Sequence, residues 1–235
     1  MRIASSRLRI FVGALAAATV TAAALISISA VTRHGSGDVD ARSPRVPADT
    51  LFAGIPQHGN VLGSTRAPVT VVEYADLQCP YCGEFARMAL PSLVRTYVRP
   101  GKVRLVFRGL AFVGPDSESA LRAVVAARRQ DRLWDLAHVI YVNQGTENTG
   151  WVTDGFLRTM AGSVGALDVP RVMSDARSTA TTNELLDLAT LARRDGVRGT
   201  PTFLAGRTGG TLTPLRVRSL DASAFGPALD RLLAS

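Results

Sequence analysis

Two cysteines separated by two residues are the chemically distinctive feature of this chain. Cys79 and Cys82 enclose Pro80 and Tyr81, and no other cysteine occurs among the 235 residues. Such a pair can close into a small disulfide ring or stay open as a dithiol, so any sulfur chemistry of the chain takes place here. A stapling disulfide stabilises more when it closes a longer loop, which makes an inert structural bridge the less favoured interpretation.

Metal and haem sites match these cysteines less well. Structural zinc normally has four cysteine or histidine ligands, and His34, His58 and His138 stand at no motif spacing from the pair. Covalent haem attachment needs a histidine directly after the second cysteine, where this chain has Gly83. We therefore expect neither a metal ion nor a cofactor.

The flanking residues place the pair where a strand passes into a helix. Residues 69–74 are a β-branched run, and residues 83–90 have the apolar spacing of a helix. Cys79 then lies near the N-cap, and Pro80 lies near the first helical position, where its missing N–H removes no bond. Free N–H groups and the helix dipole stabilise a thiolate there. We expect a lowered pKa for Cys79, with Cys82 as the less exposed, resolving thiol.

A long apolar stretch precedes the rest of the chain. Residues 10–32 are an uncharged run of 23 residues that follows three arginines. A membrane-spanning helix needs about 20 such residues, and basic residues before it keep the N-terminus inside. Residues 1–33 are therefore predicted to be a single-pass signal-anchor in the cell membrane, or a signal peptide if they are cleaved. The remaining domain is expected outside the cytoplasm, and it would be secreted or periplasmic after cleavage.

Charge and composition divide the remaining residues. Four of the 27 basic residues and none of the 19 acidic residues lie in residues 1–33, which leaves the remainder with a net charge of +4. This modest excess does not indicate a nucleic-acid partner. Residues 34–54, rich in Gly, Ser, Pro and Asp, are predicted to be a flexible linker. Residues 55–235 are predicted to form one domain, with a helical insert at about 115–195.

Periodic patterns predict the order of the elements in that domain. Strands at 69–74 and 102–107 bracket a helix that ends near residue 98 and is kinked at Pro91, so a right-handed parallel βαβ unit is expected. Trp134 and Trp151 are predicted to be core or interdomain contacts. The later elements are a loop at 143–150, helices at 154–161, 170–194 and 221–233, and a hairpin at 202–205 and 211–217. Together they predict an α/β fold with a mixed sheet and helices on both sides.

These motifs resemble the thioredoxin superfamily and, within it, the DsbA-like thiol-disulfide oxidoreductases. Three features carry the resemblance: Ala-Pro-Val-Thr at 67–70 leading to Cys-Pro-Tyr-Cys, the helical insert, and residues 196–203, which end in Thr-Pro-Thr-Phe. The resemblance extends from about residue 55 to the C-terminus. It implies a thioredoxin-like sheet with a helical insertion and an enzyme that acts as a protein disulfide oxidoreductase.

The resemblance also implies roles for residues outside the cysteine pair. Pro201 would follow a cis peptide bond and lie against the cysteines, and the backbone of Thr200 would pair with an extended substrate segment. From the residues alone, Pro201 could equally be an ordinary proline at the start of a strand. Glu73 would be a buried acid with a raised pKa that serves Cys82 as general base. The alternative is a solvated glutamate on the strand face, and Asp76 is expected on an exposed turn.

Tyr81 departs from the pattern of the most oxidising family members, which have His before the second cysteine. A tyrosine hydroxyl can donate a hydrogen bond to the Cys79 thiolate, but it carries no positive charge. We therefore expect the pKa of Cys79 to be less depressed than it would be with His.

The leading functional prediction is an extracytoplasmic oxidase that donates a disulfide to exported proteins with cysteine thiols. The reaction would pass through a mixed disulfide at Cys79, and a quinone-linked membrane partner would reoxidise the enzyme, as the resemblance implies. A reductase or isomerase on the same fold is the first alternative, because Tyr81 leaves the redox direction open. A membrane-tethered chaperone or binding module, with an incidental cysteine pair, is the second.

Overall fold

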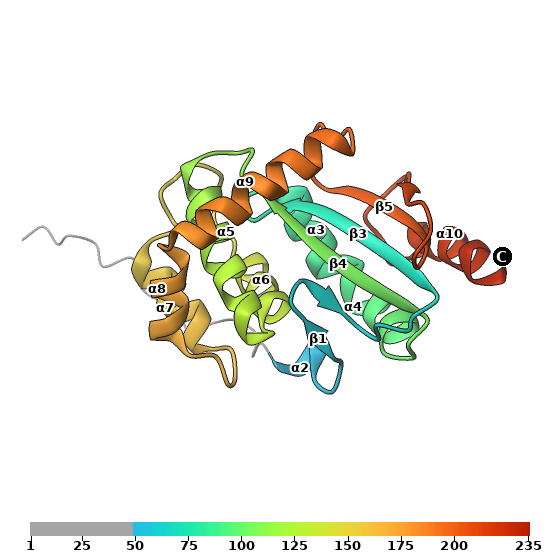
Figure 1. Cartoon of the computed structure of the whole chain (residues 1–235), viewed down its shortest axis with the longest axis horizontal. Helices are drawn as coiled ribbons and strands as arrows, with labels where there is room; N and C mark the ends of the chain where they lie inside the picture. The colour runs from blue at the N-terminus through green and yellow to red at the C-terminus, as the bar shows by residue number, and fades with distance from the viewer. Residues whose placement is uncertain (1–48) are drawn as a thin grey trace, which may run out of the picture. The chain divides into compact units, whose positions relative to one another are not determined.

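A six-stranded mixed sheet lies at the centre of residues 49–235, the part of the chain that this computed structural model describes (Figure 1). The strand order is β1-β2-β4-β3-β5-β6. Strands β3 and β4 are parallel, and the other neighbours are antiparallel. The strands are β1 Gln57–His58, β2 Val61–Leu62, β3 Val69–Asp76, β4 Val103–Leu110, β5 Thr202–Arg207 and β6 Thr213–Pro214.

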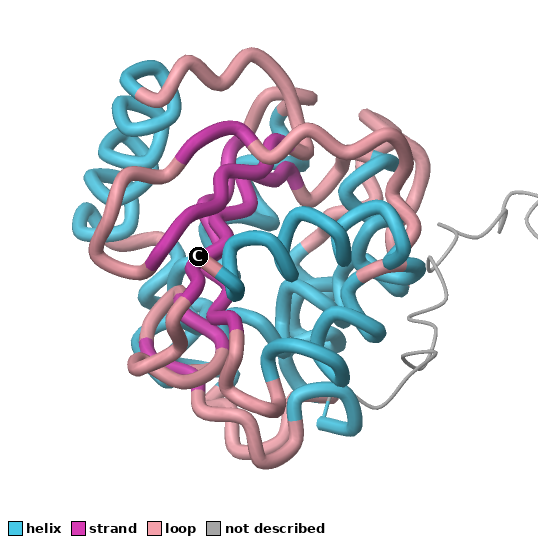
Figure 2. Tube along the Cα trace, turned by 90° about the vertical axis from the view of Figure 1, so that its right-hand side faces the viewer, coloured by secondary structure: helices cyan, strands magenta, loops and turns pink. Residues whose placement is uncertain are grey.

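Helices cover both sides of this sheet, as the view along the strands in Figure 2 shows. The helices before the insert are α2 Asp49–Phe52, α3 Pro80–Met88, α4 Leu90–Leu93 and the π-helical turn η1 Val94–Val98. The insert contains α5 Pro115–Ala127, the 3-10 turn η2 Arg128–Gln130, α6 Leu133–Val142, α7 Asp154–Gly162, α8 Val169–Ala176 and α9 Thr179–Arg194. Helix α10 Ala222–Ala234 follows the sheet.

Strand β3 is buried along its whole length, and its two faces contact different helices. Val71 and Ala75 belong to the larger core cluster, which includes residues of α3, α6 and α10. Val72 and Tyr74 belong to a smaller cluster beneath α9. Because side chains alternate along a strand, Glu73 points to the side of the cysteine helix and Tyr74 points to the side of α9.

The predicted βαβ unit and the predicted kink are confirmed. Helix α3 ends at Met88, and α4 begins at Leu90, so that Pro91 lies in the first turn of α4. Proline has no backbone N–H group. In the first turn of a helix this removes no hydrogen bond, but in the interior of one continuous helix it would remove one.

The predicted helix at 170–194 is instead two helices, α8 and α9. Ser178 separates them with an extended backbone, and its side chain accepts a hydrogen bond from the N–H of Thr181. The Thr181 hydroxyl in turn donates to the carbonyl of Asp175. This local cap starts a new helix where the apolar periodicity alone continues.

The N-terminal edge of the domain also differs from the prediction. Residues 49–54 were assigned to the linker, yet Phe52 is 2% exposed and packs edge-on against Trp134 and His138. The short strands β1 and β2 lie in a stretch too brief for a periodic signal. The predicted signal-anchor lies outside the described residues, and no helix within residues 49–235 has the length and apolarity needed to cross a membrane.

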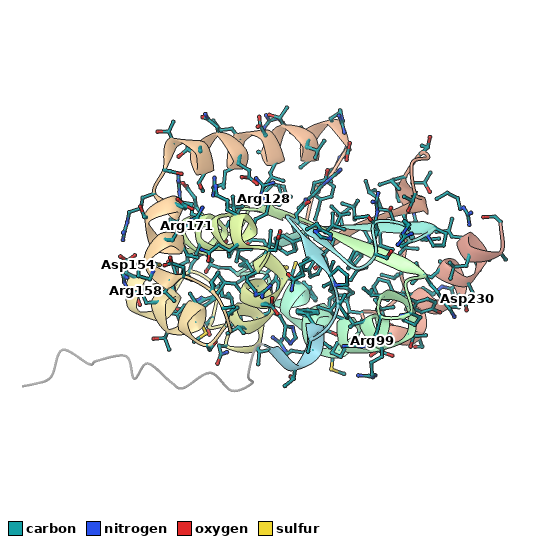
Figure 3. The ribbon with its side chains drawn as sticks, turned by 60° about the horizontal axis from the view of Figure 1, so that its bottom comes forward. Arg99, Arg128, Asp154, Arg158, Arg171 and Asp230 are labelled. Carbon is teal, nitrogen blue, oxygen red and sulfur yellow. The ribbon has the colours of Figure 1, made fainter. Side chains whose placement is uncertain are left out.

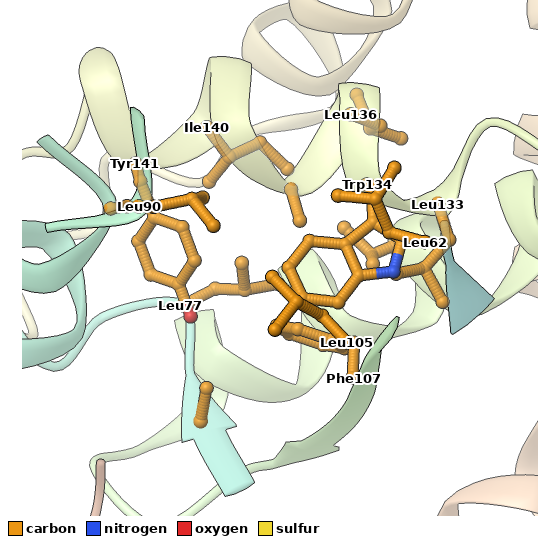
Figure 4. Close-up of a cluster of buried hydrophobic side chains, with 14 of the residues drawn as sticks. Leu62, Leu77, Leu90, Leu105, Phe107, Leu133, Trp134, Leu136, Ile140 and Tyr141 are labelled. Atoms are coloured by element: carbon orange, nitrogen blue, oxygen red, sulfur yellow. The ribbon is translucent and has the colours of Figure 1, made fainter. Parts of the chain in front are cut away.

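The insert and the sheet share one core. In Figure 4, Trp134 of α6 lies over Phe107 of β4, with ring centroids 5.7 Å apart in an edge-on arrangement. The Trp134 indole N–H donates to the carbonyl of Asn60, 3.0 Å away. Within the insert, Arg128 of η2 lies beneath α9 (Figure 3) and donates to the Glu184 carboxylate of that helix at 2.8 Å. Polar and apolar contacts therefore join the insert to the rest of the domain.

Candidate active site

The two cysteines lie at the start of α3, at the carboxyl end of β3. Cys79 is the N-cap residue, and the helix begins at Pro80. Both thiols are free, and they are 5% and 0% exposed for Cys79 and Cys82, respectively. The structure is thus that of the reduced dithiol, in which both cysteines are buried and only Cys79 keeps any exposed surface.

The surroundings shift the pKa values of the two thiols in opposite directions. A hydrogen bond from Cys82 lowers the pKa of Cys79 to about 6, against the effect of its burial, with further help from Thr200 and from the backbone N–H groups of Cys82 and Tyr81. Burial raises the pKa of Cys82 well above its usual value, and the hydrogen bond to Cys79 raises it further. Cys79 is therefore the thiolate at neutral pH, and Cys82 is the proton carrier of the pair.

Glu73 is a buried acid on the same side of the sheet as Cys82. It is 4% exposed, and its Oε1 has no hydrogen-bond partner. Burial raises the pKa of Glu73 to about 8, with a smaller contribution from the charge of Cys79. The carboxyl borders an enclosed cavity of about 10 Å³ with apolar walls that include Phe85 and Phe203.

The late proline motif lies against the first cysteine. The Thr200–Pro201 peptide bond is cis. The Cys79 thiol donates to the Thr200 carbonyl at 3.2 Å, although the two residues are 121 positions apart. The fold therefore brings Thr200 and Pro201 to the cysteine pair, and the same carbonyl would be available to a substrate when Cys79 is not a thiol.

Tyr81 acts differently from the expectation. Its side chain is 62% exposed, and within the described residues no hydrogen bond joins its hydroxyl to Cys79. Its contribution to the thiolate comes from its backbone N–H. Pro80 is exposed beside it, so the two residues between the cysteines form a surface next to the reactive sulfur.

Asp76 was expected on an exposed turn, and this expectation is wrong. The residue is fully buried. One carboxylate oxygen accepts from the N–H of Gln78 at 2.8 Å, and the other accepts from the N–H groups of Phe112 and Val113 at 2.7 and 2.9 Å. Three backbone donors from two loops thus replace water around the charge, which is what a buried carboxylate requires.

The insert contributes residues that the sequence did not reveal as part of the site. Gln78 is fully buried and donates to Ser117 at 3.0 Å, while its side-chain oxygen accepts from the N–H of Asn148 at 2.8 Å. An open groove of about 480 Å³ lies beside the cysteines and is lined by Gln78, Pro80 and residues 144–147. No local pattern marks these residues, because their partners are supplied by distant elements.

A thioredoxin-like sheet, a dithiol at a helix N-terminus and a cis-proline beside it define a class of redox proteins. A sequence model of the family described as Thioredoxin matches residues 57–213. The chain belongs to this family.

Individual relatives agree with this assignment. The chain is 32% identical over 143 residues to the probable disulfide bond formation protein D of Bacillus cereus, a match that covers 60% of this chain and 66% of that protein. The aligned part therefore spans slightly less than two thirds of the relative.

Two solved structures have the same fold. The oxidised BdbD of Bacillus subtilis superposes with a TM-score of 0.66 at 23% identity, over 76% of this chain and 94% of that one. A thioredoxin-like oxidoreductase from Silicibacter pomeroyi superposes with a TM-score of 0.59 at 29% identity, over 80% and 98% of the two chains.

Proposed function

We propose that this protein is a thiol-disulfide oxidoreductase that donates a disulfide to exported proteins with cysteine thiols. The observation that carries the proposal is the opposite shift of two neighbouring thiols, with the pKa of Cys79 lowered to about 6 and the pKa of Cys82 raised. A purely structural dithiol needs no such asymmetry. The Bacillus cereus relative, described as a probable disulfide bond formation protein D, supports the same activity.

The first step would be attack of a substrate thiolate on the Cys79 sulfur of the oxidised pair. The Cys79–Cys82 bond breaks, a mixed disulfide forms at Cys79, and Cys82 leaves as a thiolate. Because the pKa of Cys82 is high, this leaving group needs a proton. Burial raises the pKa of Glu73, so its carboxyl holds a proton that it can supply to Cys82.

The second step would release the product. A second thiolate of the substrate attacks the substrate sulfur of the mixed disulfide, and the bond to Cys79 breaks. Cys79 leaves as a stabilised thiolate, which favours this direction. The substrate has then lost two electrons and gained a disulfide, and the cysteine pair has gained the two electrons. The Thr200 backbone, beside Cys79, would hold the extended substrate chain during both steps.

Turnover would require reoxidation of the dithiol. A quinone-linked redox partner in the membrane would accept the two electrons, and residues 1–33 would anchor the enzyme in the membrane on the extracytoplasmic side. The uncharged run of residues 10–32 after three arginines supports this placement.

The thiolate at Cys79 also favours a second candidate, a reductase that keeps exported thiols reduced. A pKa of about 6 for Cys79 lies nearer to the value of about 7 for thioredoxin than to the value of about 3.5 for DsbA. A less stabilised thiolate makes the reduced form less favoured, and hence the pair less oxidising. The choice between the two directions is therefore a question of reduction potential.

Two measurements on the full-length protein in detergent test these candidates. Cys79→Ser should abolish oxidation of a reduced, unfolded substrate protein, whereas Cys82→Ala should accumulate mixed disulfides through Cys79. An oxidation rate that survives Cys79→Ser would refute the proposal. Equilibration in graded glutathione buffers would then give the potential: a value near that of DsbA supports the oxidase, and a value near that of thioredoxin supports the reductase.

A further inference from the structure

Gln144, in the loop after α6, reaches from the insert to the backbone of the active-site turn. Its side-chain amide nitrogen donates to the carbonyl of Leu77 at 2.9 Å and to the carbonyl of Cys79 at 3.0 Å. Neither carbonyl lies on the insert, and the second belongs to the reactive cysteine itself. One side chain therefore bridges the residues on both sides of Gln78.

Gly83 provides the space for this bridge. A Cβ at Gly83 would overlap the Gln144 side-chain oxygen and would come within 2.8 Å of the Arg87 guanidinium. Gly83 lies inside α3, where glycine is less favourable than alanine by about 1 kcal/mol, and its backbone needs no left-handed conformation. The close approach of the Gln144 amide explains the glycine at this position.

The two hydrogen bonds restrict the backbone around Cys79. The Leu77–Gln78 peptide group is held at both ends, since Gln144 binds its carbonyl and Asp76 accepts from its N–H at 2.8 Å. The Cys79 carbonyl accepts from Gln144 and from the N–H of Gly83, the latter at 3.1 Å. Cys79 has an extended backbone, with φ −63° and ψ 120°, and these contacts hold the peptide groups on both sides of Gln78 and at the start of α3.

We propose that Gln144 is a positioning residue that holds the backbone of Cys79 in the conformation from which its sulfur reacts, and that Gly83 is required for it to do so. The inference rests on the proposed function only in taking Cys79 as the reacting thiol. Gln144 touches no reacting atom. It acts through the carbonyl of Cys79, which sets the distance from the sulfur to the N–H groups of Tyr81 and Cys82 that stabilise the thiolate.

Through the Gln144 side chain, the helical insert helps to hold the conformation of the reactive cysteine. A second contact beside Gln144 comes from α3, where Arg87 donates to the carbonyl of Tyr141, at the end of α6, at 2.8 Å. Gln144 also forms part of the wall of the groove beside Pro80. A displacement of residues 144–147 would therefore also move the Cys79 carbonyl, because the Gln144 side chain donates a hydrogen bond to it.

The test is the rate at which iodoacetamide alkylates Cys79 in the reduced full-length protein. At about pH 5, below the pKa of Cys79, the rate is proportional to the thiolate fraction, so a rise in that pKa appears directly as a slower reaction. Gln144→Met retains a side chain of similar length without donors. It should slow alkylation about threefold to tenfold, in line with the loss of a hydrogen-bonded support, and it should make the pair less oxidising.

Gly83→Ala separates this role from a general loss of packing. Alone, it should displace the Gln144 amide and slow alkylation as Gln144→Met does. In a Gln144→Ala background no amide remains to be displaced, so the same change should slow alkylation much less, with only the Arg87 guanidinium left close to the new Cβ. Thr149→Val is a matched control, since it removes a hydrogen bond to the Thr146 carbonyl within the same loop and should leave the rate unchanged.

The outcomes distinguish this inference from the proposed function. Equal slowing by Gly83→Ala in both backgrounds, or an unchanged rate in a folded Gln144→Met protein, would overturn the positioning role. Folding is checked by circular dichroism and urea unfolding, and a variant that is less stable but reacts at the wild-type rate also counts against it. If wild-type Cys79 itself reacts only as an ordinary thiol, the proposed function fails first.

Discussion

Cys79 and Cys82 are chemically identical residues that the fold makes unlike. The first lies at an N-cap with backbone N–H groups near its sulfur, and the second lies one turn deeper with no exposed surface. The hydrogen bond between them acts in opposite senses on the two groups, because it stabilises a thiolate at Cys79 and a thiol at Cys82. Two residues, Pro80 and Tyr81, thus separate a nucleophile from a proton carrier.

Glu73 gives a prediction at the scale of one residue. Its pKa is about 8 in the folded protein against an ordinary value of 4.5. The stabilisation from its protonated form is fully present below pH 4.5, decreases as pH rises, and is lost above pH 8. In the oxidised protein neither cysteine titrates and the Cys79 charge no longer raises the pKa of Glu73, so burial alone raises it and the window ends below pH 8. Through this window Glu73→Gln should gain stability over the wild type, with a limiting slope of about 1.4 kcal/mol per pH unit.

Urea unfolding of both oxidised proteins at about pH 4, 6 and 8 measures this difference. The same Glu73→Gln protein should form mixed disulfides more slowly at neutral pH if Glu73 supplies the proton to Cys82. A stability difference that does not vary with pH would mean that Glu73 keeps an ordinary pKa.

At the scale of elements, the end of α9 is tied to the sheet through Asp195. Its carboxylate accepts from the Tyr74 hydroxyl at 2.7 Å and from Arg108 at 2.8 Å, and Arg108 also donates to the Tyr74 hydroxyl at 2.6 Å. Tyr74 and Arg108 belong to the two parallel strands, and residues 196–199 then lead directly from Asp195 to the cis-proline. The contact therefore fixes the point from which that loop departs.

Asp195→Asn should lower the free energy of unfolding by about 1 to 2 kcal/mol, because the amide keeps an acceptor oxygen but loses the charge that strengthens the hydrogen bond from Arg108. Urea unfolding measures this loss, and faster hydrogen exchange at residues 197–200 should accompany it. The control is Arg194→Gln, which removes only an exposed partner of Asp195, 3.2 Å away, and should cost little. If both variants cost the same, the network does not anchor the loop.

At the scale of the whole molecule, the sheet and the helical insert should unfold together. Trp134 packs against Phe107 and Phe52, so one side chain of α6 contacts β4 and α2. The shared core cluster includes residues from β3, α3, α6 and α10. A domain with one contiguous core is expected to unfold in a single cooperative transition.

Fluorescence can test this cooperativity with one substitution. The chain has two tryptophans, so Trp151→Phe leaves Trp134 as the sole reporter at the junction of insert and sheet. Its emission and the far-UV circular dichroism should change with the same urea midpoint, within error. An earlier midpoint for the fluorescence would show that the insert separates from the sheet before the sheet unfolds.

Local patterns in the sequence predicted several elements of the fold and the position of the cysteine pair. Alternation and helical spacing predicted β3, α3 and β4 and their parallel βαβ order, because periodicity reports which face of an element is buried. The cysteine spacing predicted the reactive pair, and proline at the first helical position predicted where the helix starts. The family resemblance, carried by the motifs around Cys79 and Pro201, added the prediction that these two residues lie next to each other. Their spacing along the chain does not show this.

Tertiary structure alone decided the environment of that pair. Asp76 has the sequence context of an exposed turn residue, yet its carboxylate is buried and accepts hydrogen bonds from distant backbone N–H groups. Gln144 is one polar residue in a loop, and its partner Cys79 lies 65 positions away. The break between α8 and α9 likewise depends on a side-chain cap that interrupts a continuous apolar pattern. A linear pattern records which residues avoid water, whereas hydrogen bonds across the fold depend on which loops it brings together.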